Sequence, residues 1–284
     1  MYKRQVQALT DVSLKVKSGE KVALLGSNGA GKSSLIDIFS GQKWPSSGTL
    51  QIFEGQYQGL QQRQQFSVLP QTMDFPKELK VKDVLRVVDS HYDCSKTSSY
   101  VERLDIATLT EKHMDQLSGG EKRRVAFLLT FIGSPNLLIL DEPTANIDIE
   151  TRRLMYAFIE DYFAEPHRTL LFSSHQISEV QRLADRIVVL HKGKVVLDET
   201  LKNIQSSLAS KKISFDTGDA FDVSTLKDIG LAQRSQWVAG KAEIFSEDSD
   251  AFVAGLVESK IPFANLRIEE ANLEEFVLKL WGQL

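Results

Sequence analysis

The chain has 284 residues, a formal net charge of −4 and a single cysteine, Cys94. Its length suits one large core or two smaller ones, so two domains are expected, and its acidic balance argues against nucleic acid as a partner. With no apolar run near the roughly 18 residues that span a bilayer and no signal-peptide stretch, the sequence predicts a soluble cytoplasmic chain.

The first predicted elements surround a glycine-rich loop. Residues 10–16 alternate apolar and polar side chains, which predicts a half-buried strand ending at the Ser18-Gly19 turn. Residues 21–25 form an apolar run typical of a buried strand, and residues 34–40 can continue as a helix. The loop between them consists of Gly26, Ser27, Asn28, Gly29, Ala30, Gly31, Lys32, Ser33 and Ser34. Strand, glycine loop and helix form the arrangement that a P-loop requires.

A P-loop binds the phosphates of a nucleotide. Its glycines adopt backbone conformations closed to other residues, so successive N–H groups can turn inward at a helix N-terminus. Lys32 would then reach the β- and γ-phosphates, and the Ser33 hydroxyl would ligate Mg²⁺. The sequence therefore predicts ATP and Mg²⁺ as cofactors.

The middle of the chain changes from strands to charged, helical patterns. Strands are expected at residues 49–53 and 66–69, and helices at residues 80–88, 98–109 and 121–132. We interpret residues 72–116 as a helical subdomain inserted into an α/β core. The basic run from Lys122 to Arg124 is adequately explained as a solvated helix face.

The next strands carry the candidate catalytic residues. Residues 136–140 form an apolar strand that ends in Asp141-Glu142, whose side chains diverge and so cannot play the same part. Asp141 is placed to bind Mg²⁺, whereas Glu142 could polarise the water that attacks the γ-phosphorus. A strand at 169–172 ends near His175, a candidate γ-phosphate contact. Strands at 187–190 and 194–197 would form a hairpin, and the alternation of strands and helices favours a parallel, helix-covered sheet.

From about residue 211 the pattern restarts. Its expected elements, in chain order, are a strand at 212–216, a helix at 223–229, strands at 236–239 and 242–245, a helix at 250–258 and a strand at 262–268. This βαββαβ order predicts a ferredoxin-like layout. A closing helix follows, with Asn272 as N-cap, Glu275 three residues later, and one apolar face made of Leu273, Phe276, Val277, Leu280 and Trp281.

Taken together, residues 2–200 resemble the nucleotide-binding subunits of ABC transporters, with the motifs in the family's order. The resemblance implies an α/β P-loop NTPase core, an ABC ATPase domain over residues 1–205, with a carboxyl-terminal α+β accessory domain over residues 211–284. It assigns further functional residues, which are Tyr2 stacking on adenine, Gln71 of the Q-loop touching Mg²⁺ or its water, Ser118, Gly119 and Gly120 of the signature binding the γ-phosphate held by the opposite subunit, Asp148 of the D-loop and His175 as the switch histidine.

Two features depart from the family pattern. Asn146-Ile147 replaces the usual alanine-leucine before Asp148. Most relatives also carry a strand before the adenine-stacking aromatic, so either this edge strand is absent or the true start lies upstream of Met1.

The resemblance implies an ATP-hydrolysing subunit that dimerises around two ATP with itself or a paralogous subunit. It would drive a separately encoded transmembrane permease from the cytoplasmic face of the cell membrane, as a peripheral subunit. The ending around Phe276 to Trp281 is similar to that of ABC-2 type exporter ATPases. The alternatives are an importer ATPase with a carboxyl-terminal ligand-sensing domain and a soluble ABC ATPase acting on ribosomes or chromosomes.

Overall fold

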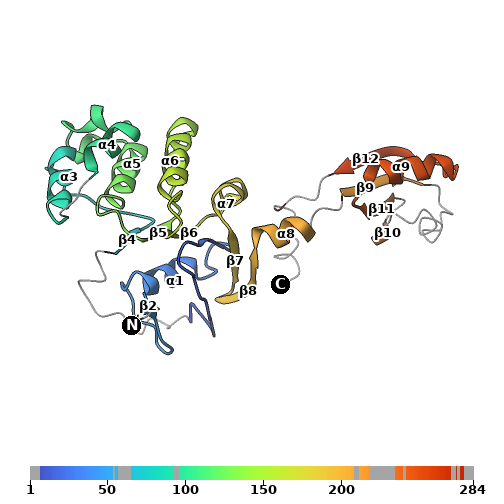
Figure 1. Cartoon of the computed structure of the whole chain (residues 1–284), viewed down its shortest axis with the longest axis horizontal. Coiled ribbons are helices and arrows are strands. Elements are labelled where there is room, and N and C mark those ends of the chain that lie inside the picture. The colour runs from blue at the N-terminus through green and yellow to red at the C-terminus, as the bar shows by residue number, and fades with distance from the viewer. Residues whose placement is uncertain are drawn as a thin grey trace, which may run out of the picture. The chain divides into compact units, whose positions relative to one another are not determined.

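The computed structural model describes residues 7–53, 55–56, 65–92, 96–207, 211–217, 234–238, 241–269, 273 and 276–277. The chain divides into two compact units, Met1–Glu199 and Thr200–Leu284 (Figure 1). The division falls ahead of residue 205, where the sequence placed the end of the first domain. Among the described residues, no helix is long and apolar enough to cross a membrane.

A six-stranded sheet forms the centre of the first unit, in the order β4-β5-β6-β1-β7-β8. The strands are β1 (Lys21–Leu25), β4 (Phe66–Leu69), β5 (Leu137–Asp141), β6 (Thr169–Ser173), β7 (Arg186–His191) and β8 (Lys194–Thr200). All pairings from β4 through β7 are parallel. The carboxyl ends of β1, β5 and β6 therefore meet at one edge, where ligands bind in open α/β sheets.

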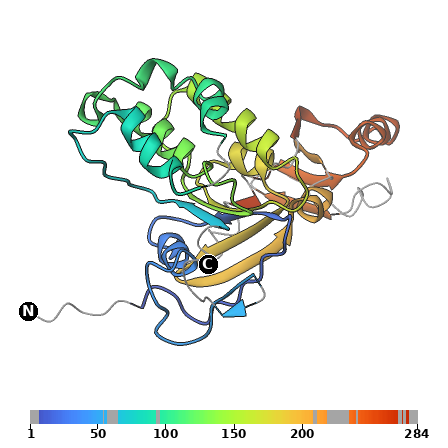
Figure 2. The ribbon, with the colours of Figure 1, turned by 60° about the vertical axis from the view of Figure 1, so that its left-hand side comes forward.

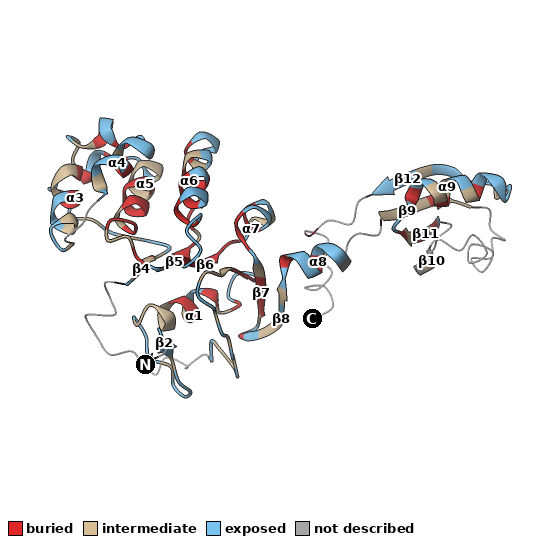
Figure 3. Cartoon of the chain, in the orientation of Figure 1, coloured by how far each residue is buried: buried red, intermediate tan, exposed pale blue. Residues whose placement is uncertain are grey.

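The central strands β1, β5, β6 and β7 are buried on both faces, as their continuous apolar runs predict. On one face, Leu35 and Ile36 of α1 (Lys32–Phe39) pack against β1, β5, β6 and β7. The opposite face is covered by α6 (Ile149–Tyr162) and α7 (Ile177–Leu183), as Figures 1 and 2 show. Figure 3 shows the buried residues concentrated on the strands and on the helix faces turned toward them.

The chain between β4 and β5 is mainly helical. It contains α3 (Val81–Asp89), α4 (Thr97–Arg103), the 3₁₀ turns η1 (Ala107–Leu109) and η2 (Met114–Gln116), and α5 (Gly119–Leu129). Aromatic rings fix these helices against α6: Phe158 lies 4.9 Å from both Tyr100 and Phe131, measured between ring centroids. Such edge-to-face pairs add stability beyond burial alone. The packing therefore holds α4 and the residues that follow α5 against α6.

Several predicted boundaries need correction. Residues 10–16 alternate in exposure as expected, and Val12, Leu14 and Val16 pack on the core, but no strand forms. In the described part of the chain, its backbone is joined to neighbouring segments by the bond from the Thr10 N–H to the Gly193 carbonyl (2.8 Å) and by a bond from the Arg186 guanidinium to the Lys15 carbonyl (2.9 Å). The alternation therefore reflects packing without a ladder. The strand expected at 49–53 shrinks to β2 (Gln51–Ile52), paired with β3 (Gly55–Gln56). The helix expected at 98–109 ends at Arg103, and α5 covers 119–129 instead of 121–132.

The second unit begins with α8 (Leu201–Ser207) and contains a four-stranded antiparallel sheet in the order β10-β11-β9-β12. Its remaining elements are β9 (Lys211–Asp216), β10 (Arg234–Val238), β11 (Lys241–Ser246), α9 (Ser249–Glu258) and β12 (Ala264–Glu269). Phe252 and Leu256 of α9 close a core with β9 and β11. Some predictions for this unit fall outside the described residues. They are the helix expected at 223–229 and, in the predicted closing helix, the N-cap Asn272, Glu275, Leu280 and Trp281.

Candidate functional site

The glycine loop follows β1 directly, and its backbone explains where the glycines fall. Gly31 has φ +108°, which strains any residue with a side chain, and a Cβ there would lie 2.8 Å from the Ala8 carbonyl oxygen. A Cβ on Gly26 would lie 2.6 Å from the Leu190 carbonyl oxygen. The loop between them, Ser27 to Gly29, is exposed. Its backbone is thus tightly held at both ends and open in the middle, as a phosphate cradle needs to be.

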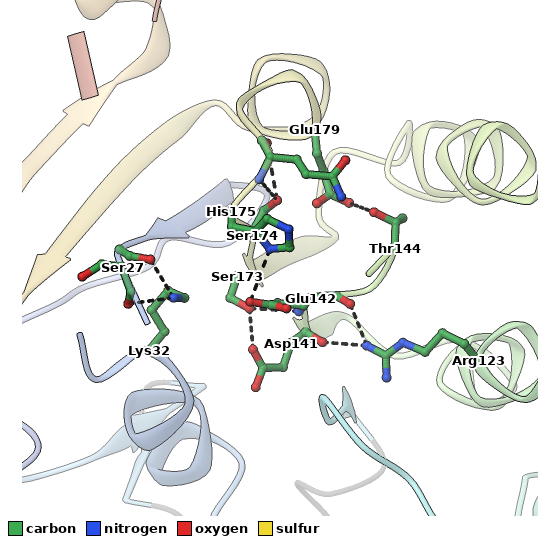
Figure 4. A network of polar contacts seen from close by, with 12 residues as sticks. Ser27, Lys32, Arg123, Asp141, Glu142, Thr144, Ser173, Ser174, His175 and Glu179 are labelled. Atoms are coloured by element: carbon green, nitrogen blue, oxygen red, sulfur yellow. Dashed lines mark hydrogen bonds and ion pairs between the residues drawn. The ribbon is translucent and has the colours of Figure 1, made fainter. Parts of the chain in front are cut away.

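Lys32 opens α1 and points back over this loop (Figure 4). Its Nζ donates to the carbonyl oxygens of Gly26 (2.7 Å) and Ser27 (3.3 Å). Burial lowers the pKa of Lys32, while the carboxylates of Glu142 and Asp141 act in the opposite direction. An ammonium held only by carbonyl oxygens can exchange them for phosphate oxygens, which carry more charge.

Ser33, Gln71 and Asp141 line one hollow of about 230 Å³. They come from α1, from the residue pair after β4, and from the end of β5. A hydroxyl, an amide and a carboxylate oxygen are hard donors of the kind that Mg²⁺ accepts beside substrate phosphates and water. The donor set in this hollow therefore fits the predicted metal, and the three residues that the sequence assigned to it are brought together.

Asp141 and Glu142 separate as their positions in the strand predict. Asp141 is buried, and its carboxylate accepts a short hydrogen bond from the Ser173 hydroxyl. Glu142 leaves the strand with φ +47°, and its backbone N–H donates to the same hydroxyl (2.9 Å). The Glu142 carboxylate lies 3.5 Å from Nδ1 of His175. The two candidate catalytic side chains are thus adjacent, and Asp141 faces a different part of the site.

Arg123 is a site residue that the sequence reasoning missed, because the basic run at 122–124 was interpreted as a solvated face. Its guanidinium donates to backbone carbonyls over distances of 2.5 to 3.2 Å. The acceptors are the carbonyl oxygens of Pro70, Gln71, Asp141, Glu142 and Pro143. A solvated face is therefore the wrong interpretation for Arg123 and also for Arg124, which is buried. Arg123 joins α5 to the segments that carry Gln71, Asp141 and Glu142, and Figure 4 shows its bonds to the last two. No signal in a single sequence separates it from its basic neighbours.

Glu179, on α7, is a second residue that sequence reasoning did not single out. It is only 1% exposed, and the Thr144 hydroxyl donates to its Oε1 (2.9 Å). Burial raises its pKa, and hydrogen bonds from Ser174 and Thr144 partly oppose this shift. Glu179 thereby links the residues that follow Glu142 to those beside His175 (Figure 4).

The signature residues do not line the hollow that Ser33 and Asp141 share. Ser118 is the N-cap of α5: its Oγ accepts from the Glu121 N–H (3.2 Å), and Glu121 Oε2 accepts from the Ser118 N–H (2.8 Å). Ser118 and Gly119 are exposed, and a Cβ on Gly119 or Gly120 would meet no atom within 4 Å. The amino terminus of α5 is therefore capped by side chains and exposed to solvent, and its backbone N–H groups can bind an anion.

Asp148 likewise stands apart from the hollow. It caps α6 by accepting from the Thr151 N–H (2.9 Å), which lowers its pKa, and its side chain is exposed. Tyr2 lies outside the described residues, so its predicted contact with adenine stays a prediction.

Comparisons with known proteins agree with this geometry. A family profile described as ABC transporter matches residues 9–145. The chain is 29% identical over 254 residues to a sulfate/thiosulfate import ATP-binding protein of Thermosynechococcus vestitus, covering 87% of this chain and 74% of the relative. It is 31% identical over 193 residues to a lantibiotic transport ATP-binding protein of Streptococcus pyogenes, covering 67% and 83%.

One solved structure with the same fold is a dimeric ATP-binding cassette in a post-hydrolysis state, bound to ADP and Pi. The TM-score is 0.62 at 24% identity, over 70% of this chain and 94% of that one. At this identity the likeness establishes the P-loop cassette fold.

Proposed function

This chain belongs to the ABC transporter family of ATP-binding proteins and is an ATPase, and from that premise we propose that it dimerises around two ATP and drives a separately encoded membrane permease. The observation that carries the proposal is the convergence of Ser33, Gln71 and Asp141 on one hollow at the carboxyl edge of the sheet. Lys32 and the Glu142–His175 pair lie beside Asp141. The partner subunit is a second copy or a paralogous ATPase.

In this proposal each residue near the hollow has its own role. The loop from Gly26 to Ser34 wraps the phosphates with backbone N–H groups, and Lys32 exchanges its carbonyl contacts for β- and γ-phosphate oxygens. Ser33, Gln71 and Asp141 would hold Mg²⁺ or its water. When bound, Mg²⁺ neutralises charge on the β- and γ-phosphates.

Hydrolysis then requires one proton acceptor. Glu142 accepts a proton from the water whose oxygen attacks the γ-phosphorus, while the bond from that phosphorus to the bridging oxygen breaks and ADP leaves. His175, 3.5 Å from the Glu142 carboxylate, contacts the γ-phosphate and orients the base. The proton leaves Glu142 with the released phosphate, so the residue is regenerated.

The exposed signature supports the dimer. The helix terminus at Ser118, Gly119 and Gly120 can bind an anion, and these residues do not line the hollow of the same chain. The γ-phosphate of an ATP held by the partner subunit is therefore the expected ligand. Asp148 would contact the partner across the same interface. A dimeric cassette with this fold bound to ADP and Pi is consistent with that arrangement.

We further propose that residues 72–116 form a helical subdomain, and that residues 211–284 form a ferredoxin-like accessory domain. The order β10-β11-β9-β12 supports the second assignment because βαββαβ chains give it. For the direction of transport we favour an ABC-2 type exporter at the cytoplasmic face of the membrane, on the similarity of the carboxyl-terminal helix. The relative that imports sulfate or thiosulfate keeps an importer ATPase as the alternative.

The test is the exchange Glu142→Gln, which keeps the side chain's shape and removes its charge. Turnover should fall by about 10² or more, as expected for loss of a general base, while ATP affinity changes little. The matched control is Glu102→Gln, which neutralises an exposed carboxylate on α4 and should leave both unchanged. Hydrolysis by Glu142→Gln at the unmodified rate would refute the assignment.

A further inference from the structure

The last residue of β6, Ser173, contacts both acidic residues at the carboxyl end of β5, Asp141 and Glu142. Ser173 is 0% exposed and pairs in register with Asp141 across the two parallel strands. Its hydroxyl donates to Asp141 Oδ1 and accepts from the Glu142 N–H at 2.9 Å (Figure 4). One hydroxyl therefore contacts the side chain of the first carboxylate and the backbone of the second.

A serine at this position is not needed for the fold. The preceding residues of β6, Leu170 to Phe172, are buried and apolar, and an apolar side chain could complete the same strand. A buried hydroxyl costs free energy unless it is hydrogen-bonded. Its one donor and one of its acceptor sites are used here, both on residues of the proposed catalytic machinery.

The two contacts have different consequences. Because Oδ1 of Asp141 is held by Ser173, the carboxylate keeps one orientation in the hollow that Ser33 and Gln71 also line. Glu142 has φ +47°, a conformation that non-glycine residues rarely adopt, and the bond to its N–H supports that turn. The turn aims the Glu142 side chain at His175, 3.5 Å away.

We propose that Ser173 is a positioning residue that fixes the Asp141 carboxylate for the metal and the Glu142 side chain for the attacking water. The inference rests on the proposed function, and it adds Ser173 as the residue that orients the side chains of Asp141 and Glu142. Ser173 touches neither nucleotide nor water in this assignment and acts through its neighbours alone.

The test compares two substitutions of equal shape. Ser173→Thr retains a hydroxyl, and Ser173→Val replaces it with a methyl group, so any steric cost is shared. Ser173→Ala removes the hydroxyl without added bulk and decides the question if neither larger residue folds. Thr130→Val is the matched control, because it deletes a buried hydroxyl that bonds only the Phe127 carbonyl, away from the hollow.

The main readout is Mn²⁺ binding to the ADP-bound protein, measured by electron paramagnetic resonance, with turnover and metal-free ADP affinity alongside. In the Val and Ala variants we expect Mn²⁺ affinity and turnover to fall about 10-fold or more, as for other residues that orient a metal ligand. Thr should retain most of both, and metal-free ADP affinity should change less than about 2-fold in all variants. The proposal would be overturned if Ser173→Val and Ser173→Thr both matched wild type in Mn²⁺ affinity and turnover and differed from it only in a lower thermal stability.

Asp141→Asn separates this inference from the function on which it rests. If Asp141→Asn loses Mn²⁺ affinity while Ser173→Ala does not, the positioning role fails and the metal assignment stands. If neither substitution changes Mn²⁺ affinity, Asp141 is not a metal ligand, and the proposed site fails together with the inference.

Discussion

At the scale of single residues, Arg123 connects more of the site than any side chain that the motifs name. Its guanidinium joins α5, which begins at the signature, to backbone carbonyls beside Gln71 and Glu142. A planar guanidinium can donate to several carbonyl oxygens at once because its N–H groups point in fixed directions, whereas the ammonium group of lysine cannot reproduce this geometry.

Arg123→Ala should therefore lower the free energy of unfolding by about 3 kcal/mol, since hydrogen bonds to charged groups contribute about 1.5 to 3 kcal/mol each and several carbonyls lose a donor. Arg123→Lys should recover only part of this loss. The neighbouring Lys122→Ala is the control and should stay within about 0.5 kcal/mol. Urea denaturation measures all three; equal effects of the Arg123 and Lys122 substitutions would return Arg123 to a solvated helix face.

The buried carboxyl of Glu179 predicts a pH dependence with a definite sign. Burial raises its folded-state pKa above the ordinary value of 4.5, so the folded protein holds this proton more tightly than the unfolded chain. Its contribution to stability is present below pH 4.5 and is lost as pH rises through the folded-state pKa.

Glu179→Gln removes that titration and keeps an acceptor for the Thr144 hydroxyl. The stability of the variant relative to wild type should therefore improve as pH rises from about 5 to 8.5, measured as the difference in melting temperature. Glu160→Gln should give a flat difference over this range, because Arg182 lowers the pKa of Glu160 below 4.5 and the carboxyl is therefore ionised in both the folded and the unfolded state. Parallel curves for wild type and Glu179→Gln would contradict the assignment of a raised pKa.

At the scale of elements, we propose that the helices between β4 and α5 transmit the nucleotide state to the membrane permease. The segment starts after Gln71 and ends at Ser118, both assigned to nucleotide contacts, so it can move as a unit when ATP binds or leaves. We predict that this segment docks the membrane permease.

Two exposed valines offer a matched comparison. Val87 on α3 is 56% exposed, and Val257 on α9 is 60% exposed. A photo-crosslinking residue at position 87 should capture the permease copurified with the tagged chain at least several-fold more than one at position 257. Preferential capture from position 257 would move the docking surface to the carboxyl-terminal unit.

Elements with strong local signals could be predicted from the sequence, and those that depend on partners far along the chain could not. β1, β4 and β5 are short apolar runs beside motifs, and their bounds agree with the prediction within about a residue. Residues 10–16 have the alternation of a strand but no strand to pair with, which periodicity alone cannot reveal.

The same distinction applies to the site. Lys32, Ser33 and Asp141 could be placed together because their motifs follow strands of one sheet, and the family resemblance added Gln71 to them. Arg123 and Glu179 could not, because their contacts come from tertiary packing and neither lies in a distinctive motif. The spatial relation of Ser118 to a partner's phosphate likewise depends on a second chain.

At the scale of the whole molecule, the apolar residues of the predicted closing helix differ in burial where the structure describes them. Leu273 and Val277 are each 1% exposed, whereas Phe276 between them is partly exposed. The sequence treated all three as one face, but only the pair spaced by four residues is fully buried.

Leu273→Asp should therefore cost about 4 kcal/mol or more, because it leaves both a cavity and a charge where the leucine packs. Phe276→Asp should cost about half as much. Urea denaturation followed by ADP binding separates the effects, since the P-loop should still bind nucleotide in protein that remains folded. Equal losses for the two variants would mean that the burial pattern does not set the stability of this helix.

The central claim is that two copies of the chain complete each other's ATP sites. The most direct test is sedimentation velocity of Glu142→Gln with and without saturating Mg²⁺-ATP, because slow hydrolysis should preserve the ATP-bound state. We expect monomers without nucleotide, dimers with ATP, and monomers again when Ser118→Arg is added to block the signature. A Glu142→Gln protein that binds ATP and remains strictly monomeric would contradict it.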